Sequence, residues 1–201
     1  MTTDKNTKHK ATQQKLKEKV DKGIAAATVQ VGVCILLTGD GKGKSSSAFG
    51  MVIRSLGYGH KVGIVQFIKG EQLSGEEIYI KEKYPSLPFY QMGTGFTWDT
   101  QDREGDIVAA QSTWVEAEKL LQNPEINLVV LDELTYMLAF DYLSEATIIN
   151  AIKNRPVQQS VVITGRGGGS VLREIADTVS EVKNIKHAYD LGIQAQKGVD
   201  F

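Results

Sequence analysis

The segment from Thr38 to Ser46, which reads TGDGKGKSS, constrains the fold of this 201-residue chain more than any other feature. An apolar run, Val29–Thr38, precedes it and is typical of a buried strand. The stretch that follows, Ser45–Leu56, has its apolar residues on one helical face and ends at Gly57. A strand, a glycine turn and a helix in this order are typical of nucleotide-binding α/β proteins.

The rest of the chain supports this fold class, because short apolar runs alternate with helical stretches. We predict a long helix at Thr100–Leu121 and further strands at Val62–Ile68, Phe89–Met92, Leu128–Leu131, Val161–Thr164 and Val179–Ile185. The runs at 128–131 and 161–164 are uninterrupted, as in central parallel strands. The expected fold is therefore α/β and P-loop NTPase-like (RecA-like), with a mostly parallel sheet flanked by helices over residues 28–201.

Composition excludes several classes of protein. A single cysteine, Cys34, leaves no disulfide scaffold and no cysteine-rich zinc site, and the three histidines lack metal-ligand spacing. No apolar stretch is long enough to span a bilayer and the opening residues are polar, so we expect no membrane association, no signal peptide and a cytoplasmic location. The formal net charge of −1 argues against a nucleic-acid partner.

The charge is uneven, because the first 22 residues hold seven lysines and only three acidic residues. Ala11, Leu16 and Val20 are the spaced apolar residues of this segment, which predicts a weakly amphipathic helix. We assign residues 1–27 to a basic helical arm. Two interpretations remain open: a solvated tail, or an arm that docks on a partner subunit.

The glycine-rich segment has the chemistry of a phosphate site. Glycines let successive backbone N–H groups point at an anion, and the N-terminus of the following helix adds positive charge. Lys44 supplies a mobile cation for the outer phosphates, and the Ser45 hydroxyl can reach Mg²⁺. The spacing departs from a strict Walker A motif, which has glycine where Thr38 stands. The predicted nucleotide-binding residues, for which a merely tight turn is the alternative, are Gly39, Asp40, Gly41, Lys42, Gly43, Lys44, Ser45 and Ser46.

Two other strand ends carry polar groups that should meet this loop, since ligands gather at the carboxyl ends of parallel strands. Asp132 and Glu133 follow the run at 128–131 and could hold Mg²⁺; an acidic helix cap is the alternative. Arg166 follows the run at 161–164 and could clamp a phosphate, or it could be an exposed residue of a glycine turn. The loop does not determine which bond of the nucleotide breaks, and kinases, ATPases and nucleotide-alkylating enzymes remain possible.

Over nearly its whole length the chain resembles the ATP-dependent corrinoid adenosyltransferases of the CobA/CobO/BtuR type. The resemblance rests on six ordered blocks, GDGKGKS at 39–45, VQFIKG at 65–70, TGFTW at 94–98, VLDELTY at 130–136, TGRG at 164–167 and ADTVSE at 176–181. Three departures stand out: Asp40 lies where Asn is common, Ser45 and Ser46 replace Thr, and residues 168–172 differ from the usual sequence.

The resemblance implies that Co(I) of a corrinoid attacks the 5′ carbon of ATP and expels triphosphate. Lys44 and Arg166 would then be catalytic, because they offset the charge on the leaving group. Ser45 and Glu133 would hold Mg²⁺, with Asp132 as a supporting residue. Co(I) is itself the nucleophile, so the reaction needs no protein nucleophile and no general base.

The family further implies a device that makes Co(II) reducible by displacing its lower axial ligand. Phe96 and Trp98 match the two aromatic residues that do this; ordinary core packing is the alternative. A reduced flavodoxin as electron donor, a homodimer, and a lid formed by residues 1–22 on the neighbouring subunit are also implied.

Two other functions compete with adenosyl transfer. A P-loop small-molecule kinase or a RecA-like ATPase would use the same loop and release ADP. A nucleotide-sensing interaction module would bind ATP without turnover.

Overall fold

The computed structural model describes residues 2–68, 73–93 and 102–201. The chain divides into two compact units, residues 1–30 and 31–201. The first contains one helix, α1 (Thr2–Ala26), so the basic segment forms a helix as its pattern predicts. Leu16, Val20 and Ile24 of this helix are about half exposed or more. The functional boundary between residues 27 and 28 stays a prediction.

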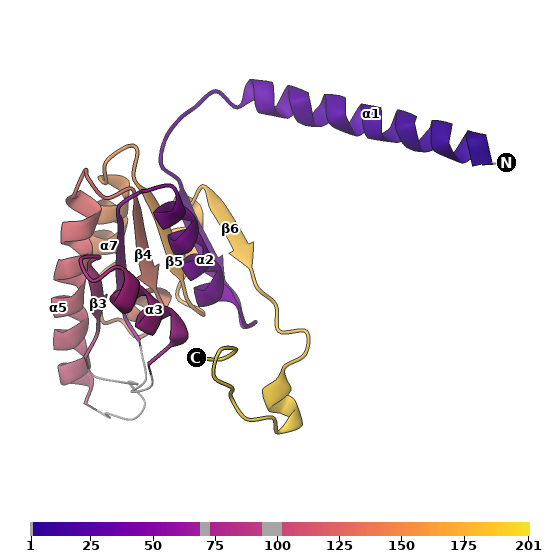
Figure 1. The fold of residues 1–201 in the computed structure, drawn as a ribbon. Coiled ribbons are helices and arrows are strands. Elements are labelled where there is room, and N and C mark those ends of the chain that lie inside the picture. Colours follow the sequence, from indigo (N-terminus) through magenta and orange to yellow (C-terminus); the bar gives the residue numbers. More distant parts are fainter. Residues whose placement is uncertain (1, 69–72, 94–101) are drawn as a thin grey trace. The chain divides into compact units, whose positions relative to one another are not determined.

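The second unit is built on one sheet, and every strand pair within the described residues is parallel (Figure 1). Its strands are β1 (Cys34–Thr38), β2 (Val62–Gln66), β3 (Phe89–Gln91), β4 (Leu128–Asp132), β5 (Ser160–Thr164) and β6 (Thr178–Glu181). Their order across the sheet is β3-β2-β4-β5-β1-β6. Because β1 lies between β5 and β6, the loop that follows β1 stands next to the end of β5. This arrangement confirms the predicted P-loop-type α/β fold.

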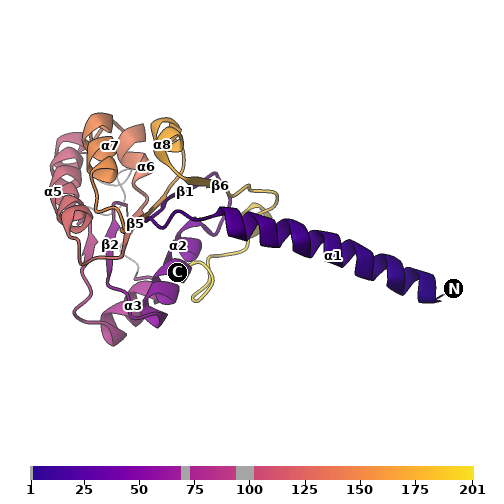
Figure 2. The ribbon, with the colours of Figure 1, turned by 90° about the horizontal axis from the view of Figure 1, so that it is seen from above.

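Helices cover both faces of the sheet, as Figure 2 shows. Helices α2 (Lys44–Gly57) and α3 (Gly75–Lys83) lie on one face. The other face carries α5 (Arg103–Gln122), α6 (Thr135–Ala139), α7 (Glu145–Lys153) and α8 (Ser170–Ile175). A short 3₁₀ helix, η1 (Ala188–Leu191), follows β6.

The two faces of the sheet hold two separate apolar clusters, because successive strand residues point to opposite sides. In β1, Leu36 packs in the cluster beneath α5, α7 and α8, whereas Leu37 packs beneath α2. Trp114 of α5 is 4% exposed and lies 6.2 Å from Phe67, ring centre to ring centre, so it is part of the core. Central strands buried on both faces explain why the apolar runs at 128–131 and 161–164 are unbroken.

Two predicted strands, the first and the last, extend beyond the observed strands by four residues or more. The first strand begins at Cys34 and not at Val29, since Val29, Val31 and Val33 are exposed. The preceding Gly32 hydrogen bonds instead to the loop before β5, through its N–H to the Val157 carbonyl at 2.7 Å. The last strand ends at Glu181 and not at Ile185, and its continuation turns to support the glycine loop.

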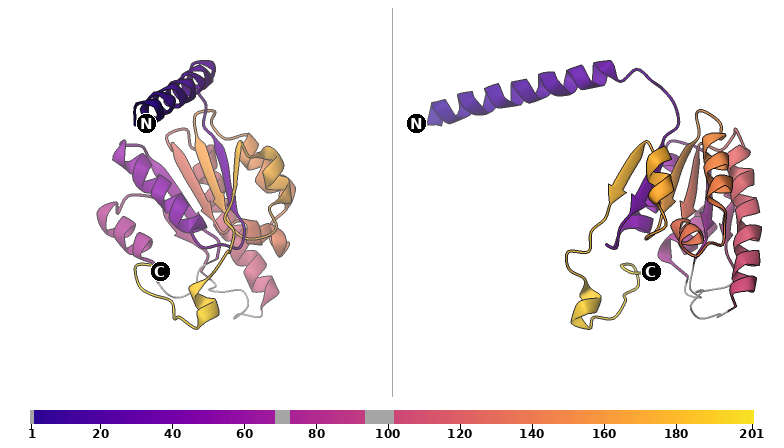
Figure 3. Two further views of the ribbon diagram at one scale, coloured as in Figure 1. Left: turned by 90° about the vertical axis from the view of Figure 1, so that its right-hand side faces the viewer. Right: turned by 180° about the vertical axis from the view of Figure 1, so that it is seen from behind.

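The carboxyl ends of the strands lie at one edge of the sheet, where the arrows point in Figure 3. Register places Gln66 of β2 opposite Asp132 of β4, and Leu37 of β1 opposite Thr164 of β5. The glycine loop, the carboxylates and the arginine turn therefore emerge side by side. Within the part of the chain that the structure describes, no helix has the length and apolarity that crossing a bilayer requires.

Candidate functional site

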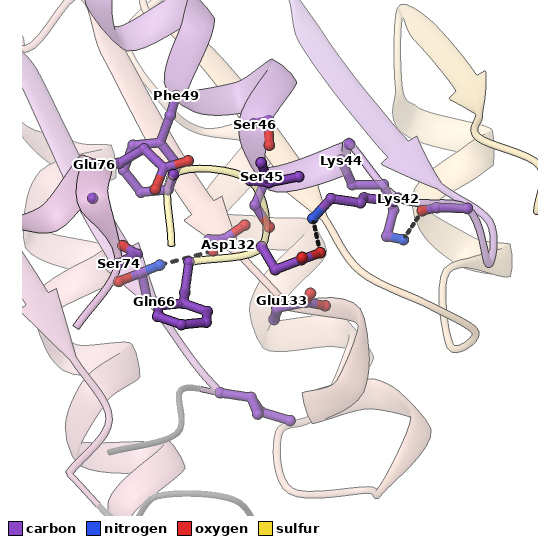
Figure 4. Close-up of a pocket in the computed structure, with 18 of the residues that line it drawn as sticks. Lys42, Lys44, Ser45, Ser46, Phe49, Gln66, Ser74, Glu76, Asp132 and Glu133 are labelled. Carbon is purple, nitrogen blue, oxygen red and sulfur yellow. Dashed lines mark hydrogen bonds and ion pairs between the residues drawn. The ribbon is translucent and has the colours of Figure 1, made fainter. Parts of the chain in front are cut away.

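A cavity of about 790 Å³ lies at this edge, over the glycine loop (Figure 4). Its walls come from the glycine loop, the ends of β2 and β4, the start of α3, the arginine turn after β5 and the end of the chain. Its lining includes Lys42, Lys44, Ser45, Ser46, Phe49, Gln66, Ile68, Ser74, Asp132, Glu133, Arg166, Val199, Asp200 and Phe201. Distant parts of the sequence thus share one site.

The glycine loop needs glycines for two reasons. Gly39 and Gly43 have φ of 97° and 120°, in the region that side chains rarely adopt. A Cβ on Gly41 would lie 2.6 Å from the Lys183 carbonyl oxygen, because the loop packs against the chain that follows β6. The Gly41 N–H also donates to the Val182 carbonyl at 2.7 Å. The loop is therefore held against β6 while α2 begins directly after it.

Lys44 is the buried cation of the site, with 5% of its surface exposed. Its Nζ donates to the Gly41 carbonyl at 2.9 Å, so the side chain folds back over the loop (Figure 4). Burial lowers the pKa of Lys44, and the nearby Arg166 guanidinium lowers it further, while Glu133 and Asp132 act in the opposite direction. Lys44, Arg166 and the two carboxylates therefore form one electrostatic cluster.

Asp132 is 3% exposed, and both of its carboxylate oxygens accept hydrogen bonds. Thr164 Oγ1 donates to Oδ1 at 2.6 Å, and Gln66 Nε2 donates to Oδ2 at 2.9 Å. Gln66 Oε1 in turn accepts from Gln91 Nε2 at 2.9 Å. The side chain is therefore fixed from two neighbouring strands, which suits a supporting residue better than a mobile ligand.

Glu133 differs sharply from its neighbour. Its backbone has φ 59°, and its N–H donates to Thr164 Oγ1 at 2.9 Å. Its Oε2 is buried and has no hydrogen-bond partner among the described residues. Burial, followed by the adjacent Asp132 charge, raises the pKa of Glu133 to about 7. An unpaired buried carboxylate oxygen beside the loop fits a bound cation, so Glu133 is the residue best suited to hold one.

Arg166 is exposed and reaches the cavity from the turn after β5. The turn is fixed to α6, because Thr135 Oγ1 donates to the Arg166 carbonyl at 3.2 Å. Gly168 has φ 57°, and a Cβ there would meet the Thr135 carbonyl and lie 2.8 Å from the Ala139 nitrogen. The glycines of this turn therefore allow it to lie against α6 beside the carboxylates.

Most of the predicted site residues meet in this cavity. The cavity is lined by Gly41, Lys42, Gly43, Lys44, Ser45, Ser46, Asp132, Glu133 and Arg166. Gly39 and Asp40 belong to the same loop but do not line the cavity, and Asp40 is exposed. Phe96 and Trp98 lie outside the described residues. Among the described residues, no three His, Cys, Asp or Glu side chains cluster as a metal site.

Sequence reasoning missed several residues of the site. Gln66 ends β2 at the same edge as Asp132, so the rule that parallel strands end together could have identified it. Ser74 caps α3 by accepting from the Glu77 N–H at 3.3 Å, and the Ser-x-x-Glu spacing is a helix-start signal. The end of the chain, residues 198–201, carried no signal that could have placed it here.

Comparisons with known proteins agree on one family. The model of the family described as "ATP:corrinoid adenosyltransferase BtuR/CobO/CobP" matches residues 30–201. The chain is 48% identical over 189 residues to a corrinoid adenosyltransferase of Escherichia coli K12, covering 94% of this chain and 95% of that one. It is 48% identical over 198 residues to a corrinoid adenosyltransferase of Pseudomonas aeruginosa PAO1, covering 98% of both.

Among solved structures, the flagellar accessory protein FlaH of Methanocaldococcus jannaschii is similar with a TM-score of 0.48 and 17% identity. That similarity covers 81% of this chain and 76% of FlaH. It is too distant to add to the assignment.

Proposed function

This chain belongs to the ATP:corrinoid adenosyltransferase family, and from that premise we propose how its cavity transfers the 5′-deoxyadenosyl group of ATP to the cobalt of a corrinoid. The observation that carries the function is the match over residues 30–201, together with the meeting of its loop, carboxylate and arginine blocks in one cavity. The enzyme is a transferase.

In the proposed reaction, Co(I) of the corrinoid substrate supplies an electron pair to C5′ of ATP. The Co–C5′ bond forms, the C5′–O bond breaks, and triphosphate leaves with the electrons of that bond, so cobalt becomes formally Co(III). Lys44 and Arg166 would offset the negative charge that grows on the departing oxygen, and the support for this is that the two cations lie close enough to act on one another electrostatically. The glycine loop and the start of α2 would hold the triphosphate throughout.

Mg²⁺ would be held by Ser45 and Glu133. The support for this is the buried Oε2 of Glu133, which has no hydrogen-bond partner in the described part of the chain, whereas both carboxylate oxygens of Asp132 accept hydrogen bonds. Asp132 would keep the end of β4 in place through Thr164 and Gln66. When bound, the cation supplies positive charge to the triphosphate oxygens.

On the resemblance alone, we assign to Phe96 and Trp98 the displacement of the lower axial ligand of the corrinoid. The double substitution to Ala should leave ATP binding and transfer from chemically supplied Co(I) nearly unchanged. It should slow turnover that begins at Co(II), because the lower axial ligand would stay in place. Equal losses in both assays would contradict this role.

Partners and location follow the same premise. We propose a homodimer, reduced flavodoxin as electron donor and a cytoplasmic location. The apolar residues of α1 that are exposed, Leu16, Val20 and Ile24, would let the arm cover the site of a neighbouring subunit.

Product analysis tests the function. The protein is incubated with MgATP and a chemically reduced corrinoid, and the corrin absorbance is followed while polyphosphates are separated. Adenosylated corrinoid and triphosphate in equal amounts are expected. ADP as the sole nucleotide product would instead identify a P-loop kinase or ATPase.

A further inference from the structure

We propose that the C-terminal turn, residues 196–201, supplies a wall of the ATP site through residues 198–201, and that this wall contacts the nucleoside of ATP. This inference rests on the proposed function of the same cavity. Val199, Asp200 and Phe201 line the cavity that the glycine loop also lines, although more than 150 residues separate the two segments. In Figure 4 the yellow ribbon of the turn runs across the view of the pocket, whose lining also includes Ser45 and Asp132.

The turn is an ordered structure with its own hydrogen bonds. The Asp200 N–H donates to the Gln196 carbonyl at 2.8 Å, and the Gln196 N–H donates back to Asp200 Oδ2 at 2.9 Å. The Gly198 N–H donates to the Phe201 carbonyl at 2.8 Å, with Gly198 at φ 77°. These bonds close the segment on itself, so its side chains are presented from a defined backbone.

An ion pair joins this turn to the glycine loop. Lys42 Nζ lies 2.8 Å from Asp200 Oδ1, and the two side chains are 40% and 26% exposed (Figure 4). The hydrogen bond from Lys42, with that from the Gln196 backbone, lowers the pKa of Asp200. Because ion pairs this exposed contribute little stability, the pair chiefly sets where the turn lies. The turn is thus fastened to the loop that would hold the triphosphate.

Charge and polarity indicate which part of ATP the turn meets. Asp200 is negative, and a negative group makes a poor surface for phosphates. Val199 and Phe201 are apolar, and the same cavity is lined by Phe49 and Ile68. The flat apolar face of an adenine base suits such a surface, while Lys44 and the start of α2 suit the phosphates. The nucleoside is therefore the part of ATP that this turn contacts.

The test compares two ligands in the full-length protein. Dissociation constants for ATP and for inorganic tripolyphosphate are measured by calorimetry with Mg²⁺ present, for the wild type and for Phe201→Ala. The ratio of the tripolyphosphate dissociation constant to the ATP dissociation constant reports what the nucleoside contributes, because effects on phosphate binding cancel. We expect Phe201→Ala to weaken ATP binding about tenfold and to leave tripolyphosphate binding unchanged. Phe201→Tyr keeps an aromatic ring at this position and should therefore have the same ratio as the wild type.

A second variant and a matched control complete the design. Asp200→Ala should also lower the ratio, since it removes the contact with Lys42 that positions the turn. Gln194→Ala lies just before the turn and does not line the cavity, and it should match the wild type. Thermal unfolding of each variant shows that it is folded.

The outcomes separate clearly. A lower ratio in Phe201→Ala and Asp200→Ala supports the proposal, whereas unchanged ratios, or equal losses for both ligands, overturn it. The function of the cavity is tested independently. If the variants show the expected ratios but the protein forms no adenosylated corrinoid, the contact with the nucleoside is supported and the proposed reaction is refuted.

Discussion

The cavity has two walls that are built in different ways. The loop wall consists of residues 41–46 with Asp132 and Glu133, and the tail wall is residues 198–201 of the C-terminal turn. Buried hydrogen bonds fix the loop wall, such as that of Lys44 to the Gly41 carbonyl. The tail wall is attached to it by the partly exposed pair of Lys42 with Asp200. Groups that must stabilise charge are thus held rigidly, and the wall assigned to the nucleoside is held more loosely.

The two walls also differ in charge. The loop wall places Lys44 in a buried position, where its attraction for phosphate is screened less than in water. The tail wall offers a carboxylate and apolar side chains. If the difference is functional, substitutions in the loop wall should affect chemistry and those in the tail wall should affect nucleoside binding.

The largest effect is expected for Lys44→Ala. This substitution removes the buried cation that offsets charge on the leaving triphosphate, and kcat/KM should fall by about 10²- to 10³-fold. Steady-state kinetics with chemically supplied Co(I) measures it. The matched control is Lys42→Ala in the same loop, which is exposed and paired with Asp200, and should lose only a few-fold. Equal losses of kcat/KM in the two variants would show that the buried Lys44 and the exposed Lys42 do not differ in their contribution to the reaction.

A smaller effect, dependent on pH, is expected at Glu133. Its pKa is raised to about 7, so between pH 4.5 and 7 the folded, unliganded protein keeps a proton that the unfolded chain has lost. Its stability should therefore fall as pH rises through this range, whereas cation binding, which needs the carboxylate, should strengthen. From pH 6 to pH 8 we expect about a tenfold gain in MgATP affinity from this group.

Glu133→Gln is the control for that prediction, because it removes the titration and keeps the shape. The γ-phosphate of ATP titrates equally with both proteins, so the difference between their pH profiles isolates Glu133. Parallel profiles for wild type and variant would show that Glu133 does not hold the cation.

The smallest effect is expected for Thr164→Val. The substitution keeps the shape of the side chain but removes the hydroxyl that donates to Asp132 and accepts from the Glu133 N–H. We expect a loss of about 1–3 kcal/mol in the free energy of unfolding. The kcat should fall only a few-fold, because no charged group is removed. Urea unfolding and initial rates measure the two effects, and an unchanged stability would show that this bridge is unimportant.

The loop wall could be predicted from the sequence because its motifs are local and the parallel topology brings them together. Central strands such as β4 are apolar and end in polar residues, and parallel strands bring their ends to one edge. The tail wall was not predictable, since the position of Asp200 depends on a contact with Lys42 that no spacing encodes. Strand ends were misplaced at Val29 and Ile185 for the same reason, because tertiary hydrogen bonds decide where pairing stops.

The central claim is that triphosphate departs intact from C5′, and one isotope experiment tests it most directly. ATP labelled with ¹⁸O at the oxygen that bridges C5′ and the α-phosphorus is converted with Co(I) corrinoid, and the products are examined by mass spectrometry. Cleavage of the C5′–O bond predicts that all of the label leaves in triphosphate and none stays with the adenosyl group. Label retained in ADP, with the γ-phosphate released or transferred, would contradict the account.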